Sequence, residues 1–146
     1  MNRLVNVAIG PKMPSNKLYK LTIAEKARLI RDGDLTATEL IDAYLQRIQR
    51  YDQELNSYTR LYDDQARKEA RLLDAERHAC RLRGPLHGVP IAVKDVFACK
   101  GSPTIAQSKA ASHEPELEDA EAVRRHDHAG RDRPRAARTL VLAASP

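Results

Sequence analysis

The sequence has few aromatic residues: five Tyr, one Phe and no Trp among 146 residues. A core built by this chain must therefore come mainly from Leu, Ile, Val and Ala. No stretch approaches the ~20 consecutive apolar residues that span a bilayer, and no basic segment followed by an apolar run opens the chain. These absences argue against a membrane protein and predict a cytoplasmic one.

The sequence also has few cysteines and few histidines close together. Cys80 and Cys99 are too few for a disulfide framework or a four-cysteine zinc site, so we expect two free thiols. His126 and His128 have no evident third ligand, which disfavours a metal site. The segment GPLHGVP, residues 84–90, lacks the Gly-Lys-Ser/Thr of a phosphate-binding loop. The sequence therefore predicts neither a metal nor a cofactor.

The formal net charge of +5 is unevenly distributed. Residues 122–146 hold six Arg and two Asp, a net charge of +4, whereas the preceding residues hold 19 basic and 18 acidic side chains. A body with balanced charge disfavours a nucleic-acid-binding face. A nucleic-acid binder that uses only the basic tail remains an alternative.

Capping patterns predict two N-terminal helices after a loose leader at residues 1–20, where Gly and Pro interrupt any period. Thr22 and Glu25 form a capping box for the first helix, which Gly33 can end in a left-handed conformation. Thr36 and Glu39 repeat the box. The second helix then carries an apolar stripe to about residue 51, made of Leu40, Ile41, Tyr44, Leu45 and Ile48.

Beyond the second helix the predicted elements alternate in type. Residues 55–62 are rich in Tyr, Thr and Leu and predict a strand, and residues 64–81 predict a mostly exposed helix. Residues 89–93 are an apolar run typical of a buried strand. Residues 101–112 predict a loop, and residues 114–125 a further helix.

Lys94 directly follows this apolar run and is the most informative position. Burial of a lysine costs several kcal/mol unless the amine is paired or neutral, and a desolvated lysine has a lowered pKa and can act as a general base. Alternatively, the side chain extends into solvent beside Asp95. Spacing alone favours the second interpretation.

The segments GPLHGVPIAVKDVF (84–97) and GSPTIAQSK (101–109) resemble the amidase signature family, and the similarity extends over residues 18–125. The resemblance implies an α/β fold with a mixed sheet covered by helices, of which this chain is an incomplete N-terminal portion. It also implies a Ser-cisSer-Lys triad with Lys94 as its lysine. Members of the family hydrolyse C–N bonds of amides or, as amidotransferase subunits, act on misacylated tRNA.

The two family serines have no counterpart in this sequence. Ser102, Ser108 and Ser112 lie in a different context from the family's Gly- and Ser-rich segments. We therefore expect the chain to be inactive by itself, although full-length relatives act on small-molecule amides. Gln107 stands where family members usually have Gly, and Gln adopts a positive φ less readily.

Residues 126–146 depart from the family and predict a disordered, aberrant basic tail. One set of codons for residues 130–135, read one base later, encodes Ala-Gly-Thr-Val-Leu-Gly, which resembles the family continuation. We therefore expect a truncated chain with a frameshifted C-terminus after the amidase portion at residues 21–125. A genuinely divergent tail is the alternative.

A non-catalytic helical interaction module is the main rival from another functional class. Its helices at residues 22–51 would pack on a partner chain. A homo-oligomer is a further alternative, because an exposed apolar stripe drives association.

Overall fold

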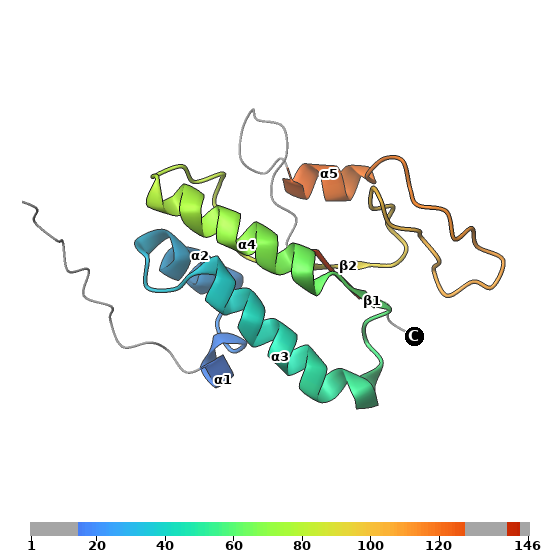
Figure 1. Cartoon of the computed structure of the whole chain (residues 1–146), viewed down its shortest axis with the longest axis horizontal. Coiled ribbons are helices and arrows are strands. Elements are labelled where there is room, and N and C mark those ends of the chain that lie inside the picture. The colour runs from blue at the N-terminus through green and yellow to red at the C-terminus, as the bar shows by residue number, and fades with distance from the viewer. Residues whose placement is uncertain (1–14, 128–139, 144–146) are drawn as a thin grey trace, which may run out of the picture.

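The computed structural model describes residues 15–127 and 140–143, and Figure 1 shows how their helices and strands are arranged. None of the described helices is long and apolar enough to cross a membrane. The elements are α1 (Ser15–Leu18), α2 (Ile23–Asp32), α3 (Ala37–Leu55), β1 (Arg60–Leu61), α4 (Asp63–His78), β2 (Ile91–Lys94), α5 (Glu121–Asp127) and β3 (Leu140–Ala143).

Both predicted capping boxes are present. In each, the threonine hydroxyl accepts a hydrogen bond from the backbone N–H of the glutamate, and the glutamate carboxylate accepts one from the threonine backbone N–H. Gly33 ends α2 with φ 88°, as predicted, and a Cβ there would lie 2.9 Å from the guanidinium of Arg77. These local signals place the starts of α2 and α3.

The predicted strand at residues 55–62 is mostly wrong. Its first residue still belongs to α3, which continues beyond the predicted end near residue 51, and only Arg60–Leu61 form a strand. Asn56 ends α3 in the left-handed region, and Asp52 accepts a hydrogen bond from the backbone N–H of Ser57 at 2.7 Å. The turn chemistry at the helix end therefore overrides the β-propensity of Tyr and Thr.

The main core lies between α3 and α4, which run side by side in opposite directions (Figure 1). Small residues on α4 allow close approach to the apolar stripe of α3. The buried cluster consists of Ala37, Ile41, Leu45, Ile48, Ala66, Ala70 and Leu73. Asp74 of α4 strengthens this contact, since its carboxylate accepts hydrogen bonds from the backbone N–H groups of Ala37 and Thr38 and from the Thr38 hydroxyl. One α4 side chain thus caps the start of α3.

The three strands form a small mixed sheet in the order β1-β3-β2. β3 pairs antiparallel with β1 and parallel with β2, with Leu140 opposite Ile91 and Ala143 opposite Lys94. The sequence analysis did not predict β3, which lies in the segment expected to be a disordered tail. Most of that segment lies outside the described residues, so the prediction for the tail as a whole stays a prediction.

The remaining elements differ from expectation in their limits. α5 begins at Glu121, not at residue 114, because the backbone of Glu116 pairs with the preceding loop: its N–H donates to the carbonyl of Ser102 and its carbonyl accepts from Gly101. α4 spans Asp63–His78 instead of residues 64–81. Within the predicted leader, α1 forms a helical turn whose Leu18 is buried in a second cluster with Ile30, Leu35 and Leu40.

Candidate functional site

Lys94 is the last residue of β2, and its side chain is exposed. β2 was expected to be buried, but only Val93 is buried in it, while Ala92 and Lys94 face solvent. The reason is that the buried face packs on Cys99 and Val123, whereas no described element covers the other face at these two residues. Among the described residues, the Lys94 amine has no hydrogen-bond or ion-pair partner in the structure.

Asp95, the next residue, is turned inward and only 5% exposed. One carboxylate oxygen lies 4.0 Å from Arg60 Nη2 and 3.5 Å from the backbone nitrogen of Ile105. The Asp95 carbonyl also accepts a hydrogen bond from the backbone N–H of Ala106 at 3.0 Å. Asp95 therefore anchors the loop that follows Lys94 to the end of β2.

Arg60 and Tyr62 complete a polar cluster with Asp95 and Ser102. Arg60 Nη1 donates to Ser102 Oγ at 2.9 Å and to the carbonyl of Pro103 at 2.7 Å. Tyr62 Oη lies 2.7 Å from the same serine oxygen. The hydroxyl of the buried Ser102 is thus engaged by Arg60 and Tyr62, and the expectation that Ser102 is no nucleophile stays a prediction. Ser108 and Ser112 cap backbone N–H groups two residues ahead.

The sequence analysis missed Arg60 and Tyr62 as members of this cluster. Each meets its partners across about 40 positions of sequence, as in the Arg60–Ser102 and Tyr62–Ser102 contacts. Arg60, the first residue of β1, and Tyr62, which directly follows this strand, carry no local signal for that contact. Only the pairing of distant segments brings them together.

The loop after β2 contains two strained residues, Ala106 with φ 48° and Gln107 with φ 58°. Gln107 is the position at which the resemblance leads us to expect Gly, and the structure places it in the left-handed region that Gly adopts readily. A non-glycine residue at this position therefore costs backbone strain.

Lys94 lines neither of two hollows on the described surface. One of about 200 Å³ lies between α1 and α3, and one of about 660 Å³ lies beside residues 112–120. Within residues 15–127 and 140–143, no three His, Cys, Asp or Glu side chains gather as metal ligands would. His128 and the side chain of His126 lie outside the described part of the chain.

Comparison with known proteins identifies the family. The family model described as Amidase matches residues 39–131, which is more than half of the chain and reaches a little past the limit at residue 125 predicted above. The chain belongs to the amidase signature family. It is 38% identical over 116 residues to an amidase from Pseudomonas putida, a match that covers 79% of this chain and 24% of the relative.

Two further relatives show the breadth of the family. The A subunit of the glutamyl-tRNA(Gln) amidotransferase from Thermobifida fusca is 43% identical over 93 residues, covering 64% of this chain and 19% of that protein. The solved peptide amidase from Stenotrophomonas maltophilia matches with a TM-score of 0.71 and 34% identity, covering 90% of this chain and 25% of the other. The chain therefore has part of the amidase fold and spans about a fifth to a quarter of the length of these relatives.

Proposed function

We propose that this chain supplies the proton-accepting lysine of an amide-hydrolysing site, with Lys94 in that role. The observation that carries the proposal is the position of Lys94 at the end of β2, beside a loop held by Asp95, Arg60 and Ser102, within a segment of amidase sequence. Because the loop is anchored, the Lys94 amine can reach only a limited set of positions. Proton transfer requires a base that is positioned in this way.

The expected chemistry is acyl transfer. A neutral lysine takes a proton from a bridging serine, which activates a second serine for attack on the amide carbonyl. A lysine becomes neutral near pH 7 when it is desolvated. Since Lys94 is exposed, the residues that desolvate it and the two serines would come from segments that correspond to later parts of the relatives.

By itself, the chain is therefore expected to hydrolyse no amide. The test is an assay of the purified chain with simple aliphatic and aromatic amides, next to the Lys94→Ala variant. Equal background rates are expected, and turnover clearly above that of Lys94→Ala would contradict the expectation of inactivity.

The role of Lys94 needs an active context. In a chain extended with the downstream segments of an amidase relative, Lys94→Ala should lower kcat/KM by about 10²–10⁴-fold, the usual contribution of a general base. Lys68→Ala is the matched control, because Lys68 is an exposed lysine on α4. Retention of most activity in Lys94→Ala would show that Lys94 is not the base.

A second candidate function is that of an amidotransferase component, which the 43% identity to the A subunit of a glutamyl-tRNA(Gln) amidotransferase favours. The same extended chain distinguishes the two functions. Ammonia-dependent conversion of misacylated tRNA with partner subunits would assign the amidotransferase role, and hydrolysis of free amides without partners would assign the amidase role.

The frameshifted C-terminus also stays a proposal. Sequencing the gene tests it directly, since codons for residues 130–135 that are incompatible with the reading one base later would remove the idea.

A further inference from the structure

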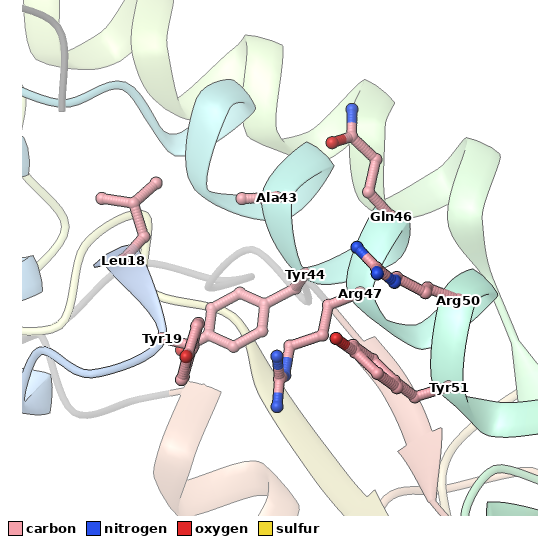
Figure 2. Close-up of a pocket in the computed structure, with 8 residues that line it drawn as sticks. All are labelled: Leu18, Tyr19, Ala43, Tyr44, Gln46, Arg47, Arg50 and Tyr51. Atoms are coloured by element: carbon pink, nitrogen blue, oxygen red, sulfur yellow. The ribbon is translucent and has the colours of Figure 1, made fainter. Parts of the chain in front are cut away.

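A hollow of about 200 Å³ lies between α1 and the middle of α3, and none of its residues belongs to the amidase motif at residues 84–109. Figure 2 shows that aromatic and cationic side chains alternate around it. The lining residues are Leu18, Tyr19, Ala43, Tyr44, Gln46, Arg47, Arg50 and Tyr51. Both Tyr19 and Tyr51 are about two-fifths exposed, so solvent reaches the rings at its mouth.

Arg47 is held between two aromatic rings. Its guanidinium carbon lies 4.1 Å from the ring centre of Tyr19 and 4.8 Å from that of Tyr51, and Figure 2 shows the side chain extending between the two tyrosines. Such stacking covers the faces of the planar guanidinium but not its edges, where the N–H donors lie. The tyrosines therefore orient Arg47 and leave its donors available.

A second cation lies beside the first. Arg50 approaches the ring of Tyr51 at 5.3 Å, one helical turn after Arg47. Among the described residues, neither guanidinium forms an ion pair with a carboxylate of the chain, whereas Arg28 of α2 and Arg67 of α4 do. The hollow thus combines two cations without a described counter-charge and three tyrosine rings.

We propose that this hollow binds a small ligand that carries an oxyanion, a carboxylate or phosphate, on a flat ring. The stacked guanidinium matches the planar, bidentate geometry of such a group, and Arg50 adds a second positive charge. The ring of the ligand would lie against the exposed tyrosines. A hollow of about 200 Å³ is smaller than the roughly 300–1,000 Å³ of sites that enclose drug-sized ligands, which favours a one-ring compound.

The experiment is a titration of the full chain with phenyl phosphate and with benzoate, followed by NMR shifts of the tyrosine rings. Saturable binding of at least one of the two is expected, and the response shows which oxyanion is preferred. Inorganic phosphate and benzyl alcohol are the comparison probes, since each carries only half of the recognised chemistry. Both should bind at least about tenfold more weakly, a difference of about 1.4 kcal/mol.

The decisive variant is Arg47→Lys, which keeps the charge but loses the planar fork. We expect it to weaken binding about tenfold or more, while Arg71→Lys, on an exposed face of α4, leaves binding unchanged. Circular dichroism of both variants verifies that α3 is intact. Absence of saturable binding, equal affinity of Arg47→Lys and Arg71→Lys, or equal binding of either comparison probe would overturn the proposal.

Discussion

The helical region at residues 22–78 and the strand-and-loop region at residues 84–120 are organised by different interactions. α2 and α3 begin with capping boxes, and α3 shares an apolar core with α4. Each region contains two side-chain atoms that are buried without a hydrogen-bond partner among the described residues: Arg60 Nη2 and Arg77 Nε in the first, Asp95 Oδ2 and Thr104 Oγ1 in the second. The regions differ in their cores, because Val93 and Cys99 are the only buried apolar side chains among the described residues 84–120. Local signals thus set the starts of α2 and α3, whereas the second region has no such caps and is held by long-range contacts such as that of Arg60 with Ser102.

This contrast predicts an uneven stability. A segment with few buried apolar side chains opens more readily than a packed core. We expect a helical chain that is poorly packed around β2 and prone to aggregate. Hydrogen exchange should show slower exchange in α3 and α4 than at residues 91–112. Equal protection in both regions and a sharp cooperative transition of a monomer would contradict this expectation.

The largest effect should come from the core of the helical region. Ile41 is fully buried between α3 and α4, and Ile41→Ala should lower the free energy of unfolding by about 2–5 kcal/mol because it leaves a cavity. The control is Ile23→Ala, at a site that is 58% exposed. Urea unfolding monitored by helical circular dichroism measures both. Similar losses in the two variants would show that the α3–α4 contact is not the main core.

A smaller effect is expected for Asp74, which connects α4 to the start of α3. Asp74→Ala would leave the N–H groups of Ala37 and Thr38 without their acceptor and should cost about 1–3 kcal/mol. Asp74→Asn, which retains one acceptor oxygen, should fall between the wild type and Asp74→Ala. The same unfolding assay decides, and an Asp74→Ala variant as stable as the wild type would refute this capping role.

The link between α4 and the loop before β2 should depend on pH. Arg83 donates two hydrogen bonds to Glu76, at 2.5 and 2.8 Å, and these bonds lower the pKa of the Glu76 carboxyl group. Because the folded pKa lies below the unfolded value of about 4.3, the stabilisation is present above that value and is lost as pH falls through the folded pKa.

Glu76→Gln should therefore cost about 1–2 kcal/mol at pH 7 and reduce the acid sensitivity of unfolding below pH ~4. Urea unfolding of wild type and variant at pH 7 and at pH 3 provides the measurement. If the free energies of unfolding of wild type and Glu76→Gln differ by the same amount at both pH values, this ion pair is not a source of the pH dependence.

The smallest effect should come from a local cap. Thr36→Ala removes the hydroxyl that accepts from the Glu39 N–H at 3.0 Å and should cost about 1 kcal/mol. Thr59→Ala is a control at an exposed threonine outside the helices. If the two variants differ by less than the error of the unfolding measurement, local capping contributes little to this region.

Sequence patterns predicted the helical region well because its signals are short in range. A capping box spans three residues and a helical stripe repeats every three or four, so α2 and α3 were placed at their true starts. The strand at residues 55–62 was predicted wrongly because β-propensity depends on pairing partners. The family segment at residues 84–109 identified Lys94, but its role as a base remains a prediction.

The sequence by itself determined the family, the caps and apolar faces of α2 and α3, and the candidate lysine. The tertiary structure alone placed the strand Leu140–Ala143 between β1 and β2. It brought Arg60 and Tyr62 into contact with Ser102 and left the side chain of Lys94 exposed. It also brought Tyr19 and Tyr51 to Arg47. Most of these features are contacts between residues far apart in the chain, and the exposure of Lys94 depends on which elements pack around it. Long-range contacts and exposure leave no periodic pattern and no motif in the sequence.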